Sequence, residues 1–552
     1  MPGRSIYDNL GAVRDIVDVC DLLHKSTGLI FIDQEHAFDS IDHSYLFAIL
    51  KGFGFGRIFV SYIQLLYHNI YSLFKINNEL IPPFTVTRGI RQGCPLSGLL
   101  YVLSIEPLLV KLREKLVGFS VAPDIPAIKV VAYADDICTT IQCQEDVSEL
   151  LKTMNNFTLA CSARVNWTKS YASFFGLAMH FSFPTLPNNL SWKNNSVYHL
   201  GVHLGDAQSI QKNWDGLTDK VYSRLQRWRG LLCKLSYHGR VLVINNLVSS
   251  ILWHRFIVLQ PPAWLIKNIQ KHLIDFFWGG KHWLRPGVLS LSRNEGGQGL
   301  VDITSRIMTF RILFVKKLLY NHMPWESLTL CLLKQAGRLG YGRELFLLDL
   351  LKIDVSPLPL YMQSVINAWQ ALSLQREVTS FTAWMFLNEP VFYNPILTGI
   401  PSSRAFVQYF VGSNILLVHN LLDFSKERWK SGHEISTITG LKSIRIIGQL
   451  FSAILKALMS YGMGFRSLFD IVDLPNQYAF PVLLLDWDGK SVPLNSIEKG
   501  NLYSFCIQYI FADSVKSPFG IQWKEHLPTS TPLVPAWRGL YTPPISKRAG
   551  DL

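Results

Sequence analysis

Two apolar segments that lie about 100 residues apart in the chain each lead into aspartate. Leu29–Ile32 has the composition of a buried strand and runs directly into Asp33. The segments 129–133 and 137–141 have the composition of hairpin strands, and Ala134-Asp135-Asp136 lies between them. Apolar runs bounded by turn residues predict strands buried in a sheet. The pattern therefore favours an α+β domain in which two strands each deliver aspartate at an end.

The remainder of the first 205 residues has mainly helical periodicity. Apolar residues that recur three to four positions apart predict helices, here over residues 5–25, 43–67, 99–117 and 145–161. Residues 71–88 alternate like a hairpin that turns at Asn77-Asn78. Beyond residue 205 the periodicity is helical. We expect three regions: an α+β domain over 1–205, a helical region over 206–275, and a mostly helical region of unknown role over 276–552.

Composition excludes several classes of protein. With 49% hydrophobic and 17% charged residues, the 552-residue chain is not disordered in bulk. Its eight cysteines form no CxxC pair, which argues against a disulfide scaffold or a zinc knuckle. The most apolar stretch, 241–259, is interrupted by two asparagines, His254 and Arg255, so we expect no membrane-spanning helix there. A helical membrane or scaffold protein is therefore the weakest interpretation.

Carboxylates at neighbouring strand ends can hold magnesium. Mg²⁺ prefers oxygen ligands and binds best alongside substrate phosphates. A pair of such ions stabilises the attacking and the leaving oxygen of an in-line phosphoryl displacement. A single aspartate is more often a turn or cap residue. Here the apolar strand before Asp33, the hairpin that carries Asp135 and Asp136, and the Gly/Pro loop 89–95 between them favour the metal site.

Five short motifs in order resemble those of the reverse transcriptases of non-LTR (LINE-type) retrotransposons. Phe31–Asp39 resembles motif A, Arg91–Ser97 resembles motif B, and Tyr133-Ala134-Asp135-Asp136 is similar to the YxDD box of motif C. Asn166–Lys169 corresponds to motif D, and Leu200-Gly201-Val202 to motif E. Their order and spacing make the resemblance specific over residues 1–205, and a weaker similarity extends over 276–300.

The resemblance implies a fold and an activity. The fold would be a right-hand polymerase palm with partial fingers, followed by a helical thumb and a mostly helical C-terminal region. The activity would be that of an RNA-directed DNA polymerase, which transfers nucleotides to a primer 3′-OH with two Mg²⁺ ions, or with Mn²⁺. The implied partners are an RNA template, a DNA primer and dNTPs, with no membrane and with protein partners unknown. The implied location is intracellular, in the nucleus or the cytoplasm.

The resemblance also implies roles for single residues. Asp33 and Asp135 would be the catalytic metal ligands, and Asp136 would support them. The residues implied to bind the incoming nucleotide are Phe38, as the steric gate against a 2′-OH, with Gln92, Gly93 and Lys169. The alternatives are a core phenylalanine, an ordinary Gly/Pro turn and an exposed helical lysine.

A basic segment follows the motifs. Between Lys220 and Ile274 the chain has nine Lys or Arg and no Asp or Glu, within a net charge of +13. Each phosphate neutralised by such residues adds salt-dependent affinity for nucleic acid, and a solvated helix face is the alternative. The residues expected to follow a template–primer backbone are Lys220, Arg224, Arg227, Arg229 and Arg240.

Two departures from the family pattern bear on activity. Motif A of these enzymes usually has lysine where this chain has His36. The chain also begins part-way through the region that corresponds to the fingers, and we expect a truncated element copy or a partial gene model with slow extension. Two hypotheses therefore stay open: a reverse transcriptase, or a catalytically inactive, nucleic-acid-binding remnant of one.

Overall fold

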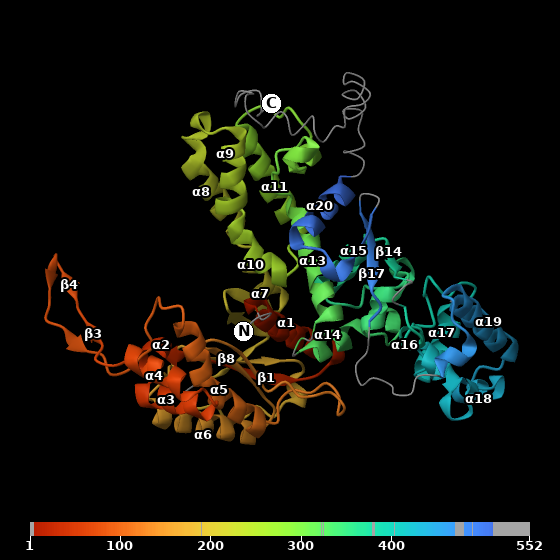
Figure 1. Cartoon of the computed structure of the whole chain (residues 1–552), viewed down its shortest axis with the longest axis horizontal. Coiled ribbons are helices and arrows are strands. Elements are labelled where there is room, and N and C mark those ends of the chain that lie inside the picture. The colour runs from red at the N-terminus through yellow and green to blue at the C-terminus, as the bar shows by residue number, and fades with distance from the viewer. Residues whose placement is uncertain are drawn as a thin grey trace. The chain divides into compact units, whose positions relative to one another are not determined.

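The computed structural model describes residues 5–188, 190–321, 323, 325–377, 381–401, 403–469, 480–487 and 490–511. The chain divides into two compact units, Met1–Lys212 and Asn213–Leu552, which Figure 1 shows in red to yellow and in yellow to blue. Each unit mixes helices with strands. The further division at residue 275 remains a prediction.

A five-stranded sheet in the order β11-β10-β1-β8-β7 forms the centre of the first unit. Its strands are β1 (Thr27–Ile32), β7 (Val130–Tyr133), β8 (Asp136–Ile141), β10 (Tyr171–Phe175) and β11 (Trp192–Asn194). The central strand β1 is buried along its length and pairs antiparallel with β8 and β10. A side chain at Gly28 would lie 2.4 Å from the Trp192 ring, so only glycine fits at this position of β1.

Helices cover the sheet. They are α1 (Ile6–Leu23), α3 (His43–Gly52), α4 (Arg57–Leu66), α5 (Ser97–Lys115) and α6 (Gln144–Cys161). Ile30 and Ile32 of β1 join one apolar core with residues of α3 to α6. In Figure 1, α1 lies on one side of the sheet and α6 on the other. The short elements of this unit are β2 (Gln34–Glu35), α2 (Ala37–Ser40), β9 (Arg164–Val165), β12 (Ser196–His199), β13 (Val202–Gly205) and α7 (Ala207–Gln211).

The prediction of one helix over 43–67 is wrong. The structure has two helices, α3 and α4, separated at Phe53–Gly56. Gly54 has φ +81°, in the left-handed region that a continuing helix cannot use and that glycine adopts without strain. The other three predicted helices and both hairpins of the first 165 residues lie within a few residues of their predicted ends, whereas the short helix α2 was not predicted.

A narrow hairpin, residues 71–85, extends from the end of α4, and we call it the arm (Figure 1). It contains two short ladders, β3 (Tyr71–Ser72) with β6 (Phe84–Thr85) and β4 (Lys75–Ile76) with β5 (Glu79–Leu80). Asn77 and Asn78 form its turn with φ values of +49° and +70°. Positive φ at both central residues is the type I′ pattern of tight hairpins, so the expected turn is confirmed.

The second unit is mostly helical. Its longer helices are α8 (Leu217–Arg229), α10 (Ser250–Val258), α11 (Ala263–Trp278), α13 (Ile303–Tyr320), α15 (Leu360–Gln370), α17 (Arg404–Gly412), α19 (Ile444–Ser460) and α20 (Lys499–Ile510). The shorter helices are α9 (Tyr237–Leu242), α12 (Pro286–Ser290), α14 (Glu326–Leu333), α16 (Ala383–Leu387) and α18 (Gly432–Thr439). Two small sheets lie among them, β14 (Leu374–Arg376) with β17 (Leu483–Trp487) and β18 (Lys490–Pro493), and β15 (Leu422–Asp423) with β16 (Arg428–Trp429).

Arg311 of α13 is fully buried at the end of α10. Its guanidinium donates to the carbonyl oxygens of Phe256 (2.9 Å), Ile257 (3.1 Å) and Leu259 (2.7 Å). The last carbonyl groups of a helix have no partner within the helix. Arg311 supplies hydrogen-bond donors to these carbonyl oxygens at the C-terminal end of α10.

Among the described residues, no single helix has the length and apolar composition needed to cross a membrane. Two bent pairs, 237–248 with 250–258 and 432–439 with 444–460, meet the length and composition criteria only when taken together.

Candidate active site

The register of β1 and β8 brings the predicted aspartates to one edge of the sheet. Ile32 pairs with Ile137 across these antiparallel strands, so the next position of β1, Asp33, lies beside Asp136. The backbone of Asp33 is fixed on its other side. Its N–H donates to Ser170 Oγ (3.1 Å) and its carbonyl oxygen accepts from the Asn166 N–H (2.8 Å).

The β7–β8 hairpin carries the other two carboxylates. Tyr133 pairs with Asp136, so only Ala134 and Asp135 form the loop. Ala134 has φ +51°, a conformation that is uncommon for a residue other than glycine. The tight loop holds Asp135 next to Asp136 at the edge where β1 delivers Asp33, and the structure thus brings the three aspartates together.

Negative charge is concentrated at this edge. Partial burial, and then the charges of Asp135 and Asp33, raise the pKa of Asp136 to about 6. Burial, and then the charges of Asp135, Cys161 and Asp136, also raise the pKa of Tyr101. Like charges disfavour each other's ionised form. A bound cation would offset this repulsion between the carboxylates.

The donor set fits a hard divalent ion, because carboxylate oxygen is what Mg²⁺ prefers. Within the described ranges, however, no group of three or more His, Cys, Asp or Glu is arranged to hold a metal ion by itself. A metal at this edge would therefore need further oxygen ligands from a substrate or from water.

Phe38 lies in α2, and its ring stacks on Tyr101 of α5 with the ring centroids 4.2 Å apart. Phe38 is half-buried against the apolar core, and the Tyr101 hydroxyl donates to Gln34 Oε1 at 3.0 Å. Phe38 thus packs like a core residue, although it follows Asp33 closely in the chain. Sequence reasoning missed Tyr101, because one tyrosine in an apolar helix carries no signal that it will meet Phe38.

The Gly/Pro loop contacts motif A. Gln92 Nε2 donates to both carboxylate oxygens of Asp39 (3.3 and 3.4 Å). A side chain at Gly89 would lie 2.9 Å from the Asp39 carbonyl oxygen, so the loop approaches motif A closely. Gly93 has φ +84° and open space around its Cα. Glycine is therefore favoured here by the backbone conformation and not by a close approach of another group. The Asp39–Gln92 contact was not predicted.

Lys169 lies in an exposed turn between β9 and β10, so its alternative interpretation as a helical lysine is wrong. The Lys169 N–H donates to the carbonyl and side-chain oxygens of Asn166, both at 3.2 Å. Because Asn166 in turn bonds to the Asp33 backbone, the turn that carries Lys169 is connected to the aspartate edge.

The five basic residues predicted to contact nucleic acid have different surroundings. Lys220, Arg224 and Arg227 line a groove of about 540 Å³ on α8, together with His254 and Arg255. Arg229 lies at the end of α8 and does not line this groove.

Arg240 donates to the carbonyl oxygens of Phe277 (2.7 Å), Trp278 (3.2 Å) and Leu232 (3.0 Å). Three backbone acceptors therefore occupy the Arg240 guanidinium, which supports the end of α11.

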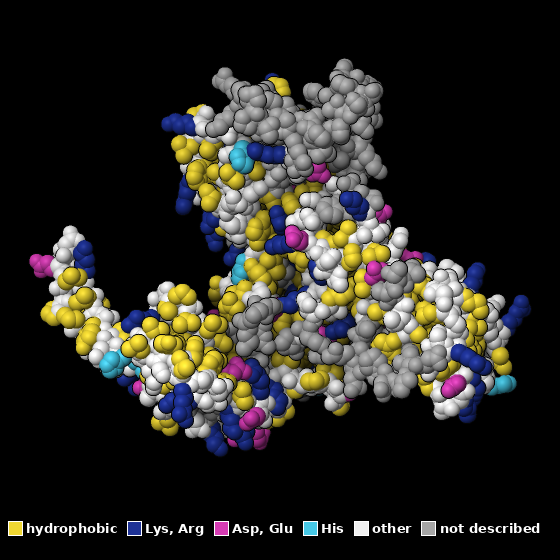
Figure 2. Space-filling view, in the orientation of Figure 1, with side chains coloured by type: hydrophobic (Ala, Val, Ile, Leu, Met, Phe, Trp, Pro, Cys, Tyr) yellow, Lys and Arg dark blue, Asp and Glu magenta, His cyan; other side chains and the backbone are white. Residues whose placement is uncertain are grey.

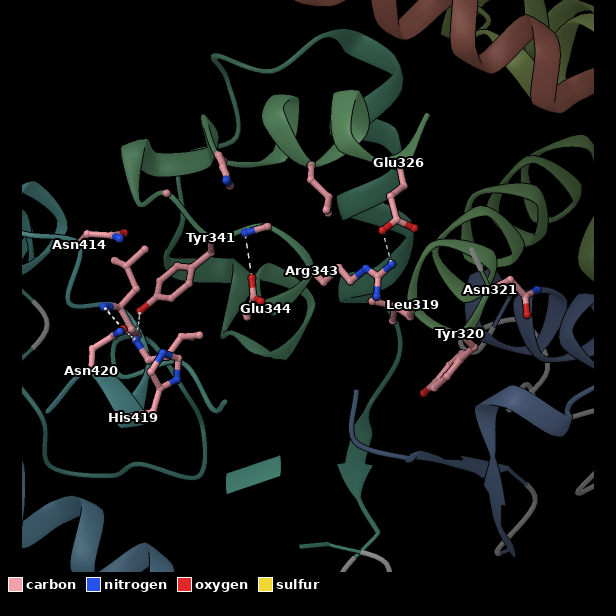
Figure 3. A pocket seen from close by; sticks show the side chains of 16 residues that line it. Leu319, Tyr320, Asn321, Glu326, Tyr341, Arg343, Glu344, Asn414, His419 and Asn420 are labelled. Carbon is pink, nitrogen blue, oxygen red and sulfur yellow. Dashed lines mark hydrogen bonds and ion pairs between the residues drawn. The ribbon is translucent and has the colours of Figure 1, made fainter. Parts of the chain in front are cut away.

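A larger pocket, of about 700 Å³, lies elsewhere in the second unit (Figure 3). Its charged groups bond to the protein. Arg343 forms an ion pair with Glu326 at 2.6 Å, and Glu344 accepts from the Gly342 N–H at 3.0 Å. The Tyr341 hydroxyl donates to the Leu416 carbonyl oxygen at 3.0 Å. No sequence motif pointed to these residues, and the paired charges assign no chemistry to the pocket.

The structure is a mixed sheet whose central antiparallel strands gather aspartates at one edge, with helices on both sides, and this arrangement fits a polymerase fold. Residues 1–204 match the family model described as "Reverse transcriptase (RNA-dependent DNA polymerase)". These residues therefore form a reverse transcriptase domain, and the chain is a relative of non-LTR retrotransposon proteins. The resemblance found in the motifs is confirmed.

The relatives have related names. The chain is 36% identical over 461 residues to "Transposon TX1 uncharacterized 149 kDa protein" of Xenopus laevis, covering 82% of this chain and 35% of that protein. It is 27% identical over 171 residues to the "Retrovirus-related Pol polyprotein from type-2 retrotransposable element R2DM" of Drosophila melanogaster, covering 31% and 16%. The chain thus spans about a third or less of these relatives.

A solved telomerase from Candida albicans, in complex with a fragment of telomeric RNA, aligns with a TM-score of 0.27 at 11% identity. The alignment covers 50% of this chain and 47% of that chain. At this score the likeness carries no argument.

Proposed function

We propose that this chain acts as an RNA-directed DNA polymerase of a non-LTR retrotransposon, extending a DNA primer on an RNA template with dNTPs. The observation that carries the proposal is the β1–β8 register, which puts Asp33 beside Asp136 at the tip of the hairpin that also holds Asp135. This edge lies inside the domain that matches the reverse transcriptase family. In this proposal residues 1–205 are the palm with partial fingers.

Asp33 and Asp135 would hold two Mg²⁺ ions, with Asp136 adding negative charge beside them. When bound, such ions stabilise the attacking and leaving oxygens of an in-line displacement and neutralise phosphate charge. The chain's own part is to fix the carboxylates. The hydrogen bonds that the Asp33 N–H donates to Ser170 and that the Asp33 carbonyl oxygen accepts from Asn166 support that role. The partial burial and neighbouring carboxylates that raise the pKa of Asp136 to about 6 support it as well.

The nucleotide would be positioned by residues around this edge. Phe38, held by its stack on Tyr101, would exclude a 2′-OH. Gln92, oriented by Asp39, and the glycine backbone at Gly93 would contact the nucleotide and template. Lys169 would pair with the pyrophosphate. Orientation of reactants in this way supplies a large share of an enzyme's rate enhancement.

The helices over 206–275 would act as the thumb. The groove lined by Lys220, Arg224 and Arg227 is mostly cationic, although Asp219 also lines it and Arg224 donates to the Leu247 carbonyl oxygen at 2.7 Å, and this charge suits a phosphate backbone. Arg229 remains a candidate at the end of α8. The contacts of Arg240 with three carbonyl oxygens make it the weakest of the five candidates.

A primer-extension assay tests the proposal. The full chain, a labelled DNA primer annealed to an RNA template, dNTPs and Mg²⁺ should give elongated primer, and Asp135→Asn should reduce elongation at least about a thousandfold. Asp124→Asn, an exposed acid in the loop before β7, is the matched control and should extend normally. Extension that survives Asp135→Asn would contradict the carboxylate assignment. Template binding without any extension by the unmodified chain would favour the inactive remnant.

A further inference from the structure

Helix α4 is apolar on two opposite sides. Val60 and Ile63 are buried in the core of the first unit, with exposed fractions of 3% and 1%. On the other side Ile58, Tyr62 and Leu65 are 73%, 63% and 70% exposed. A surface helix normally carries one apolar stripe towards its core and polar residues outside. Among the described residues of this unit, the outer stripe of α4 therefore has no partner.

The exposed apolar surface continues on both sides of this stripe. Phe55 and Phe59 stack on each other at 5.1 Å, and both are exposed, as is Leu66. We call these residues and the outer stripe of α4 the α4 face. Figure 2 shows hydrophobic side chains gathered here and along the arm. Contiguous apolar patches of this kind mark interaction sites in soluble proteins.

The arm extends the same surface. Its exposed apolar residues are Tyr71, Leu73, Phe74, Ile76, Leu80, Ile81 and Phe84. Its two ladders are each two residues long, and a lone hairpin of this size is marginally stable in water. Packing against another surface would stabilise the arm.

Charge restricts the partner of this surface. Between residues 53 and 85 the only charged side chains are those of Arg57, Lys75 and Glu79. A nucleic acid would need a cationic surface, and a charged protein surface would lose solvation here without gaining ion pairs. The partner must itself be apolar and poor in charge.

We propose that the α4 face binds the α4 face of a second copy of this chain across a two-fold axis. The outer stripe is nearly symmetric about its middle, because Ile58 lies four residues before Tyr62 and Leu65 lies three residues after it. An antiparallel pairing sets Ile58 against the partner's Leu65 and Tyr62 against the partner's Tyr62. Two-fold interfaces use one self-complementary patch in this way.

The available area suits a dimer. The six large side chains of the α4 face would each bury about 100 Å², or about 600 Å² per copy, taking an aromatic side chain as about 200 Å² in full. A standard interface buries about 800 Å² per partner. The arm, whose exposed residues continue the same apolar surface, can supply the remainder by lying against the partner.

Sedimentation of the full chain tests the proposal. We expect a dimer at micromolar concentration, and Ile58→Glu with Leu65→Glu should weaken association at least a hundredfold. The control, Leu159→Glu on α6, places one such charge at a site that is 85% exposed and should leave the dimer intact. Circular dichroism should be unchanged, because the substituted side chains already face solvent. A monomer up to about 50 µM, where an interface of micromolar Kd would be filled, would overturn the proposal.

Cross-linking tests the axis itself. Among the described residues Cys233 is the one exposed cysteine, while Cys94 and Cys143 are partly exposed. In a Cys233→Ser background, Tyr62→Cys should give a linked dimer with a short bis-maleimide. Met179→Cys, 84% exposed in the same unit, should not. Equal cross-linking at both sites would overturn the two-fold pairing. The chain could instead stay monomeric and bind a polypeptide from the part of the TX1 protein outside the aligned region. The α4 face would then be an interface within a longer polyprotein, and the proposal would be wrong.

Discussion

At the scale of single residues, His199 makes the stability of the first unit depend on pH. Its ring is buried against Phe31, with centroids 5.0 Å apart, and its Nε2 lies 3.2 Å from Asn9 Oδ1. Burial lowers the pKa of His199 to about 4. The folded chain keeps this imidazole neutral below the pH at which the unfolded chain protonates it.

The sign of the effect follows from linkage. A depressed histidine pKa means that the unfolded state takes up the proton first, so stability is complete above about pH 6.5 and falls as the pH drops towards 4. Between pH 7 and pH 5 we expect a loss of about 2 kcal/mol from this group. Urea unfolding of the unmodified chain and of His199→Gln, compared at the two pH values, isolates this loss, because the raised pKa values of Asp18 and Asp136 change stability in the opposite direction in both proteins. An equal pH dependence in the variant would place its origin elsewhere.

Phe38 offers a second prediction at this scale. If the ring that stacks on Tyr101 also excludes a 2′-OH, then Phe38→Ala should lower the preference for dNTP over NTP about tenfold or more, because a steric clash in the transition state is removed. The ratio of kcat/KM values in primer extension measures it. Phe47→Ala, which removes another half-buried ring from the same core, is the control.

An unchanged ratio in Phe38→Ala, with a loss of stability similar to that of Phe47→Ala, would mean that Phe38 is only a packing residue.

The sequence allowed the aspartates to be predicted but not their neighbours. Asp33 and Asp135 follow apolar strands, and strand ends can be read from local composition. The stack of Phe38 on Tyr101 and the bond of Gln92 to Asp39 depend on how α5 and the Gly/Pro loop pack. Such contacts join residues more than fifty positions apart and have no local signature.

At the scale of elements, α3 and α4 show why helical period alone was insufficient. The apolar spacing continues through residues 43–67, but Gly54 and Gly56 interrupt the helix. The break lets Val60 and Ile63 of α4 turn into the core while Ile58 and Leu65 remain outside. Periodicity indicates which residues share a face, whereas glycine conformation decides where that face points.

The contacts of Arg311 lead to a prediction about the stability of the α10–α13 pair. Arg311→Met should destabilise the second unit by about 3–5 kcal/mol, because buried carbonyls lose charged donors. Arg311→Lys should rescue little, since one ammonium cannot reach three carbonyl oxygens spread over Phe256 to Leu259. Thermal unfolding measures both. The control is Lys352→Met, which removes an exposed ion pair with Asp349. A change below about 1 kcal/mol for Arg311→Met would refute this role.

Helix α8 gives a prediction about binding. If its groove contacts a primed template, log Kd should vary linearly with log salt concentration. Arg224→Glu with Arg227→Glu should lower the slope by about one for each lost phosphate contact, without changing sequence preference. Arg240→Glu should instead destabilise the end of α11, because its donors hold three carbonyl oxygens there. An unchanged slope would make the α8 cations a solvated face.

At the scale of the whole molecule, sequence patterns indicated the first unit far better than the second. Motif spacing identified the domain over 1–205, and the structure has a compact unit over 1–212. Over 276–552 only helical period was available, and β14 with its partner strands β17 and β18 was not foreseen. Strand β14 lies about 110 residues before its partner β17, so no local pattern links these two strands.

Metal removal tests the full chain. EDTA removes the divalent cations without which the three aspartates repel one another, so primer extension should stop. Binding of the primed template depends on basic side chains and should persist. Mg²⁺ in excess should restore extension, with Mn²⁺ as an alternative. Gel shift and extension on the same samples separate the two effects. Extension in EDTA after dialysis would rule out a divalent mechanism.

The register of β1 against β8 has a consequence for how a gene that encodes this chain can diverge. Along a strand, successive side chains point to opposite faces, so a one-residue slip exchanges the two faces. Point substitutions in β8 change single side chains and leave the pairing of Ile32 with Ile137 in place. Loss of a single codon between 137 and 141 would force the strand either to bulge or to slip. Slippage would change the register, so Asp136 would no longer lie beside Asp33. The pairing of β8 with β1 can therefore tolerate many substitutions within β8, but not the deletion of one codon.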